Sequence, residues 1–282
     1  MLVVGEWLWC GGVEEKKMKM VERKEWLDFV EEGERKMMDR VAQISERLQH
    51  LKRDVKHLLD VVQEPLEKLK LIDSIQRLGV SYHFENEIET ILRDIYENHY
   101  SKDNHEDDTL FNISLKFRLF RQQGYTVSCG VFEKLRNEKG EFNMSLIDDI
   151  LGMLNLYEAS HLAIHGEEIL DQALDFTTFH LQSRLSDMRS DHKEKVTHAL
   201  KWPLHKTMPR LTARYNIALH SNDGSRNELL LEFAALDFNI LQVQHQEELS
   251  HLTNFSFNPR LVSSTCVPYD LGLYAFTVNM LA

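Results

Sequence analysis

The hydrophobic positions of this chain repeat at helical spacing through most of its length. In residues 41–62 the apolar residues follow one another at steps of three and four, which places them on one stripe of a helix that ends just before Pro65. A coiled coil has a similar stripe, but this one lasts only about three heptads before another helical pattern begins. Packing within the same molecule is the favoured interpretation. The stripe consists of Val41, Ile44, Leu48, Leu51, Val55, Leu58 and Val62.

Two further helices follow this first one. Periodic apolar residues predict a helix over residues 66–78, and Gly79 stands where a left-handed residue ends a helix. Asn86 is predicted to cap the next helix, with Glu89 as its capping-box partner three residues later. The sequence therefore predicts successive helices from residue 41 onward.

Capping and breaking residues bound the later helices as well. Thr109 is predicted to begin a helix that Gly124 ends, and Ser145 is predicted to cap a helix that runs to about residue 157. Residues 167–185 have one apolar side, and the loop at 221–225 precedes a long helix. No convincing β segment occurs before residue 254, so the predicted fold class is all-α.

The last segment of the chain, residues 254–282, differs from the rest. It contains only Arg260 and Asp270 as charged residues, and its helical periodicity fades. An apolar segment of this kind is expected to form a strand, an irregular cover or an adhesive surface, and the pattern leaves these alternatives open.

Composition and charge exclude several classes of partner. The chain has 282 residues, a formal net charge of -12 and a pI near 5.6, so no general attraction to nucleic acid or to an anionic membrane is expected. No stretch reaches the about 18 consecutive apolar residues of a membrane span. The three cysteines, Cys10, Cys129 and Cys266, lack metal-ligand spacing and fit a reducing compartment. A cytoplasmic location is therefore expected.

Two adjacent aspartate pairs are candidates for holding the hard cations that diphosphate chemistry requires. They are Asp107–Asp108 and Asp148–Asp149, but Phe111 and Gly152 stand where a DDxxD motif has its third carboxylate. A solvated loop and the first turn of a helix explain the two pairs better.

His161, His165 and Glu168 are a second candidate metal group, because residues three to four apart can share a helix face. However, Leu162 occupies the place of the general base in an HExxH site, and Gly166 is expected to break the helix. Polar residues at a helix corner are the favoured interpretation.

Two weaker motifs occur near the end of the helical region. Glu248 and His251 form one E-x-x-H, which a di-iron bundle would need twice. Arg210 and Arg214 could clamp an anion, but surface pairing with glutamates explains such arginines more often. Neither motif predicts a site.

Five collinear segments are similar to plant terpene synthases, in particular to the sesquiterpene branch. The resemblance covers roughly residues 41–253, whereas residues 1–40 and 254–282 match nothing in that family. Asn216 stands where the family prefers an aromatic residue. The segments are Leu69–Phe84, Phe117–Val131, Leu156–Leu174, Met208–Ile217 and Leu230–Leu249.

The resemblance implies that residues 41–253 form an all-helical α-barrel domain, a catalytically silent relative of the class II cyclase domains. In the full-length family a second helical domain holds Mg²⁺ on DDxxD and NSE/DTE motifs and ionises a prenyl diphosphate such as farnesyl diphosphate. Neither these motifs nor the class II DxDD motif occurs in this sequence. We therefore expect no catalytic, cofactor-binding or metal-binding residue here, and no activity of the chain alone.

The resemblance also bears on partners. The face that normally meets the second domain would be exposed, and such contacts bury about 600–1,500 Å². Self-association, or binding to a terpene synthase through this face, is the expected result. An alternative function is a helical interaction or regulatory module that binds a full-length synthase. Because both ends depart from the family pattern, we expect an altered or partial gene.

Overall fold

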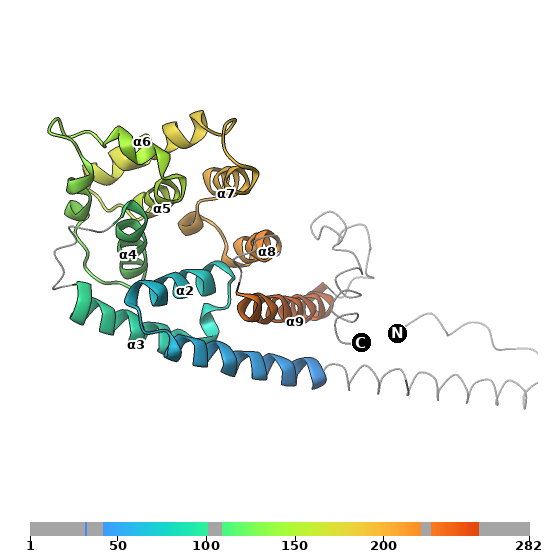
Figure 1. Ribbon diagram of the computed structural model, residues 1–282. Coiled ribbons are helices and arrows are strands. Elements are labelled where there is room, and N and C mark those ends of the chain that lie inside the picture. Colours follow the sequence, from blue (N-terminus) through green and yellow to red (C-terminus); the bar gives the residue numbers. More distant parts are fainter. Residues whose placement is uncertain (1–31, 33–41, 101–108, 221–226, 254–282) are drawn as a thin grey trace, which may run out of the picture. The chain divides into compact units, whose positions relative to one another are not determined.

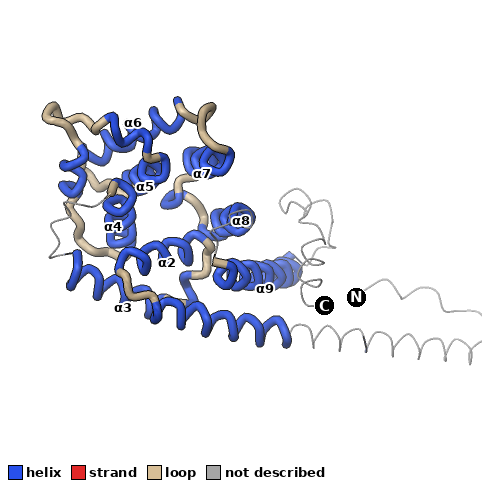
Figure 2. The backbone as a smooth tube through the Cα atoms, viewed as in Figure 1, coloured by secondary structure: helices blue, strands red, loops and turns tan. Residues whose placement is uncertain are grey.

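The computed structural model describes residues 32, 42–100, 109–220 and 227–253. Helices dominate these residues, and no strand occurs among them (Figure 2). The β-type pairing in this part of the chain is one isolated antiparallel bridge between Arg136 and Phe142. The all-α prediction is confirmed for the described residues.

The helices follow one another with short connections (Figure 1). A helix over residues 42–61 comes first. Shorter helical turns stand at Ser81–His83, Tyr96–Tyr100, Cys129–Leu135, Met144–Asp148 and Leu204–Lys206. The α-helices are α2 (Pro65–Arg77), α3 (Glu85–Ile95), α4 (Leu110–Gln122), α5 (Ile150–Ser160), α6 (Glu168–Ser183), α7 (Ser190–Lys201), α8 (Pro209–His220) and α9 (Glu228–Thr253).

The chain divides into two compact units, Met1–Leu236 and Asp237–Ala282, with the boundary inside α9. The first unit contains the helix over residues 42–61, α2 to α8 and the start of α9. In the second unit the described residues, 237–253, continue α9. The predicted domain limits at residues 40 and 253 stay predictions.

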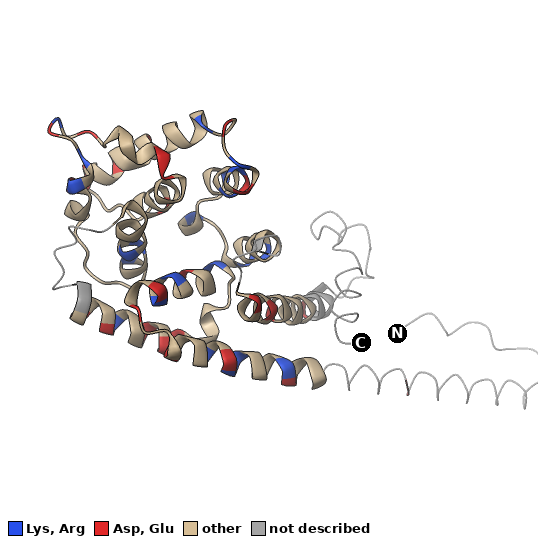
Figure 3. Cartoon of the chain, viewed as in Figure 1, with Lys and Arg blue, Asp and Glu red and all other residues tan. Residues whose placement is uncertain are grey.

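The core of the first unit centres on α4 and α5, which pack against each other. Residues 152–160 of α5 are all buried, because α2 packs on α4 while α6 and α7 pack on α5. Glu158 is the one charged residue of α5, whereas the helix over residues 42–61 and α3 carry many charges (Figure 3). Charge is therefore frequent on the outer helices and rare on α5, whereas α4 carries three basic residues.

The first predicted stripe has the buried face that its spacing requires. Leu51 and Val55 are buried, and Leu59, outside the predicted stripe, is buried beside them. The same helix is joined to the start of α9, where Arg47 donates two hydrogen bonds of 2.8 and 2.7 Å to the carboxylate of Glu232. The favoured interpretation, packing within one molecule, is thus confirmed for this helix.

Three of the predicted helix boundaries are confirmed by their geometry. The Thr109 hydroxyl accepts a hydrogen bond of 3.3 Å from the backbone N–H of Asn112 at the start of α4. After α2, Gly79 has φ 74°, in the left-handed region that glycine enters without strain. Gly124, after α4, has φ 87°.

Two predicted caps are wrong. Helix α3 begins at Glu85 after Phe84, so Asn86 lies inside its first turn and no side-chain cap bond forms. Phe84 is fully buried, and burial of this ring fixes where the helix starts. Ser145 lies in a 3-10 turn, and the cap of α5 is Asp149, whose carboxylate accepts a bond of 2.8 Å from the Gly152 N–H.

Two helices, α7 and α8, were not predicted from periodicity. Only Val196 and Ala199 of α7 are fully buried, which leaves too few apolar positions to form a recognisable stripe. Helix α8 begins at Pro209, in the first helical position, where proline is favoured although it breaks a helix further along. The predicted loops at 101–108 and 221–225 and the segment 254–282 lie outside the described residues.

Candidate functional site

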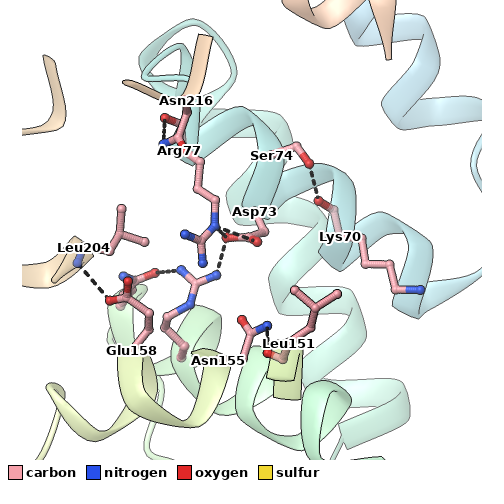
Figure 4. A network of polar contacts seen from close by, with 11 residues as sticks. Lys70, Asp73, Ser74, Arg77, Leu151, Asn155, Glu158, Leu204 and Asn216 are labelled. Carbon is pink, nitrogen blue, oxygen red and sulfur yellow. Dashed lines mark hydrogen bonds and ion pairs between the residues drawn. The ribbon is translucent and has the colours of Figure 1, made fainter. Parts of the chain in front are cut away.

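A group of charged side chains, here called the buried charge network (Asp73, Arg77, Arg118 and Glu158), lies in the core of the first unit. Helix α2 supplies its first two members, four residues apart, so that Arg77 Nε donates to both carboxylate oxygens of Asp73 at 2.9 and 3.0 Å. In Figure 4 these side chains point from α2 toward Glu158 on α5. The network thus lies where inner helices meet.

Arg118 on α4 is the most deeply buried member, with a 1% exposed side chain. Its Nη2 donates to Asp73 Oδ1, and its Nη1 donates to Gln122 Oε1 at 3.1 Å. A guanidinium has five N–H donors and stays charged, so its burial requires a carboxylate partner. Asp73 is that partner, and it joins α2 to α4.

Glu158 and Asn216 extend the network to the segment that follows α7. Glu158 is 2% exposed and accepts a bond of 2.8 Å from the backbone N–H of Leu204. On α8, Asn216 Nδ2 donates at 2.9 Å to the Arg77 carbonyl oxygen, which belongs to the last turn of α2. Polar side chains therefore join α2 to α4 and α8, and join α5 to the turn at Leu204–Lys206.

The two carboxyl groups of the network have opposite pKa shifts. Burial alone would raise the pKa of Asp73, but the guanidinium groups of Arg118 and Arg77 lower it below its ordinary value. Burial raises the pKa of Glu158 above its ordinary value, despite the opposing effects of Arg77 and the Leu204 N–H. The arginines thus hold Asp73 ionised and compensate Glu158 only in part.

A second polar group, the Arg121 clamp (Arg121, Glu167 and Cys129), holds the end of α4. Arg121 pairs with Glu167 and donates to the carbonyls of Val127, at 2.7 and 3.1 Å, and Leu162, at 3.0 Å. The hydrogen bonds that the Glu167 carboxylate accepts from Arg121 and from the Ile164 N–H lower its pKa to about 2. Burial and the Glu167 carboxylate raise the pKa of the Cys129 thiol, which leaves it a poor nucleophile.

The aspartate pairs do not form a cation site in the described residues. Asp148 pairs with Arg184 at 2.9 Å, while Asp149 caps α5. Asp107 and Asp108 lie outside the described residues. In the part of the chain that the structure describes, no group of three or more His, Cys, Asp or Glu side chains could hold a metal ion. The side chains that the structure describes do not fit Mg²⁺.

The histidine candidates are separated by the end of a helix. His161 is the C-terminal cap of α5, Gly166 lies in a turn, and Glu168 begins α6, so these groups share no helix face. His165 is exposed. The backbone therefore supports the interpretation of these three residues as polar groups at a helix corner, not as a metal site.

The remaining sequence candidates lie on two helices. Glu248 is an exposed residue of α9, in the second unit, and the side chain of His251 is outside the described set. Arg210 and Arg214 lie one turn apart on α8, both partly buried. No described helix has the length and apolarity needed to cross a membrane.

Sequence reasoning singled out no member of the buried charge network. A signal was available, since Arg118 stands inside the apolar run LFNISLKFRLF and Glu158 inside LGMLNLYEAS. A charge at a core-facing position of an otherwise apolar helix indicates a paired, buried group. Its partner on α2 could not be identified from spacing, because the contact spans 45 positions.

His161 predicts a measurable pH dependence of stability. Burial, with smaller effects of Lys206 and His205, lowers its pKa from 6.5 to about 4, and neither ring nitrogen has a hydrogen-bond partner among the described residues. Between pH 6.5, the ordinary pKa of histidine, and about pH 4, His161 is protonated in the unfolded chain but neutral in the folded chain. This contribution to stability is therefore present above pH 6.5 and is lost as the pH falls toward 4.

The test compares urea unfolding midpoints at pH 7.5 and 5.0. We expect the wild-type urea midpoint to be lower at pH 5.0 than at pH 7.5. The decrease should be smaller in His161→Leu, because leucine takes up no proton. Replacing the exposed His57 by glutamine serves as the matched control and should leave the difference unchanged. Equal losses in the wild type and in His161→Leu would contradict the assignment.

Comparisons with known proteins identify the family. The sequence-family model described as the terpene synthase N-terminal domain matches residues 25–200. A sesquiterpene synthase from Cananga odorata is 50% identical over 210 residues, which cover 74% of this chain and 37% of that protein. Valencene synthase from Vitis vinifera is 47% identical over 212 residues, 74% of this chain and 38% of that protein.

A solved structure agrees with these sequence matches. Isoprene synthase from grey poplar, in complex with three Mg²⁺ ions and dimethylallyl-S-thiolodiphosphate, superposes with a TM-score of 0.71 at 34% identity and covers 76% of this chain and 41% of that one. This chain thus spans about two fifths of the length of the relatives that it matches. The predicted all-α barrel of this family is confirmed by the helical fold and by this likeness. The chain belongs to the terpene synthase family and carries its N-terminal domain.

Proposed function

We propose that the described helices are the N-terminal scaffold of a sesquiterpene-forming terpene synthase. Several relatives with the matching sequence are named sesquiterpene synthases, which supports farnesyl diphosphate as the substrate of the whole enzyme. The match covers less than half of each relative. The ionisation of the diphosphate is therefore assigned to residues beyond the matched portion.

One observation carries this proposal: the buried acids of the first unit are already engaged. Asp73 is held by two arginines, Glu158 by a backbone N–H and Glu167 by Arg121. A magnesium cluster requires carboxylate oxygens that converge on the cation. Acids that pair with arginines across helix contacts stabilise the fold and are not free to bind such a cation.

Mg²⁺ is proposed for the whole enzyme only. The isoprene synthase complex contains three Mg²⁺ ions, and this supports metal-dependent chemistry in the longer relatives. In this chain the charge network and the Arg121 clamp hold the helices in position. They supply a rigid body on which a catalytic domain can be mounted.

The test is a domain exchange with valencene synthase. Its N-terminal region is replaced by the matched region of this chain, and the hybrid is incubated with farnesyl diphosphate and Mg²⁺. We expect the hybrid to form valencene, because the product is determined outside the exchanged region. This chain alone is expected to form no volatile hydrocarbon above a boiled control.

Two outcomes would contradict the proposal. Hydrocarbon formed by this chain alone would show that it contains a complete ionisation site. A hybrid that folds, judged by its circular dichroism and unfolding midpoint, but forms no product would show that the region is more than an interchangeable scaffold. Valencene synthase prepared in the same way provides the reference rate.

We also propose a partner surface on α9 and a cytoplasmic location. Ile240 and Leu241 are partly buried and Val243 is 42% exposed, which supports binding of a further helical body, such as a second copy of the chain or the rest of a synthase. Light scattering of the purified chain, with and without full-length valencene synthase, tests this association. The free thiol of Cys129 supports a reducing compartment, which imaging of a fluorescent fusion tests.

A further inference from the structure

We propose that the core between α4 and α5 binds one water molecule, held by Ser114, Arg118 and Asn155. Ser114 Oγ, Arg118 Nε and Asn155 Oδ1 are buried atoms without a hydrogen-bond partner among the described residues. The three residues are 0%, 1% and 6% exposed. A buried polar atom without a partner costs about 1–3 kcal/mol, so three of them in one region indicate a shared ligand.

The two helices that carry these atoms run parallel in a fixed register. At one end, a Cβ on Gly152 would lie 2.9 Å from Leu110 Cδ2. At the other end, Arg121 Nη1 donates to the carbonyl of Leu162 at 3.0 Å. The two contacts join residues that lie 42 and 41 positions apart in sequence. Ser114 and Asn155 are also 41 positions apart, so Ser114 on α4 is level with Asn155 on α5.

Both residues also lie on the helix faces that meet. On α4 the positions 110, 114 and 121 fall on one stripe, whose first residue lies against Gly152 of α5 and whose last bonds to the Leu162 carbonyl just after α5. On α5 the positions 152 and 155, with 162 just beyond the helix, form the corresponding stripe toward α4. Ser114 therefore faces Asn155, with Arg118 one turn further along the same face of α4.

The remaining atoms of these side chains fix where the free atoms point. Asn155 Nδ2 donates to the Leu151 carbonyl at 3.1 Å, which directs Oδ1 away from its own helix backbone. Arg118 uses Nη1 for Gln122 and Nη2 for Asp73, which leaves Nε as the atom without a partner. Residues one turn apart are about 5–6 Å apart, a distance that two hydrogen bonds through one water span.

Water fits this set of atoms better than an ion does. Arg118 Nε donates, Asn155 Oδ1 accepts and the Ser114 hydroxyl does either, so one water accepts from the arginine and donates to the amide. The guanidinium would repel a cation, and the amide oxygen would repel an anion. Buried waters make about three hydrogen bonds to groups of this kind. The water completes the bonding of Arg118 and thereby supports the buried charge network.

The direct test is a high-resolution crystal structure of the chain, examined for solvent density within hydrogen-bond distance of all three atoms. We expect one ordered peak. Direct contact between Ser114 or Asn155 and Arg118 Nε, without a solvent peak, would overturn the proposal. This readout uses the unchanged protein, so it does not depend on whether a variant folds.

A double-mutant cycle provides a second readout. Ser114→Ala and Asn155→Ala are each expected to lower the thermal unfolding midpoint, and the double variant should lower it by less than the sum, because both changes remove the same water. Ser160→Ala is the matched control, since that buried hydroxyl is already bonded at 2.7 Å to the Leu156 carbonyl. Its effect should add to that of Asn155→Ala. Additive losses for Ser114 and Asn155 would count against a shared ligand.

Discussion

Replacing Asp73 by alanine is expected to lower the free energy of unfolding by about 3–5 kcal/mol, because it leaves a buried arginine without its carboxylate. Arg118 is 1% exposed, and its ion pair with Asp73 spans α2 and α4. Arg77 loses the same partner and is less affected, since 21% of its side chain is exposed. A domain of ordinary stability, about 5–15 kcal/mol, would lose a large share of it. Urea unfolding monitored by circular dichroism measures the change.

Two further variants separate this effect from a general loss of packing. Asp73→Leu combined with Arg118→Met replaces the pair by apolar side chains of similar size and should recover most of the stability that Asp73→Ala loses. Asp148→Ala removes an ion pair in which Asp148 is 85% exposed, so its effect should stay below about 1 kcal/mol. A double variant as unstable as Asp73→Ala would show that the charge pair is not the cause.

A feature of this fold can be predicted from the sequence when it depends on residues close in sequence, and not when it depends on tertiary contacts. The stripe through Leu51 and Val55, the cap at Thr109 and the left-handed residue Gly79 depend on neighbours within one or two turns, and the structure confirms all of them. The cap at Asn86 is wrong because burial of Phe84, a tertiary interaction, determines the start of α3. Local capping preferences are weaker than the burial of an aromatic ring.

The polar core shows the same limit more strongly. Arg118 and Glu158 are visible in the sequence as charges inside apolar runs, but their partners are 45 or 46 positions away. The water site depends on the register of α4 against α5, which no single helix specifies. The absence of a catalytic residue was an expectation from family motifs, and it stays a prediction that the assay with farnesyl diphosphate tests.

Gly79→Ala is expected to destabilise the domain through two separate effects. The residue has φ 74°, and an L side chain in this region costs about 1–2 kcal/mol. In addition, a Cβ at this position would lie 2.6 Å from Ala213 Cβ on α8, and such overpacking typically costs about 1–3 kcal/mol. The sum, about 2–5 kcal/mol, should appear in the free energy of unfolding.

Gly124→Ala is the matched control for the backbone effect alone. Gly124 has φ 87°, and no atom lies within 4 Å of the Cβ that alanine would add. Its loss should therefore stay near 1–2 kcal/mol, about the cost of the left-handed backbone. Ala213→Gly, introduced into Gly79→Ala, removes the clash at a helix cost of about 1 kcal/mol, so the double variant should lose less than the sum of the single changes. If Gly79→Ala and Gly124→Ala are equally destabilising, the close approach of α8 to the end of α2 is not a determinant of stability.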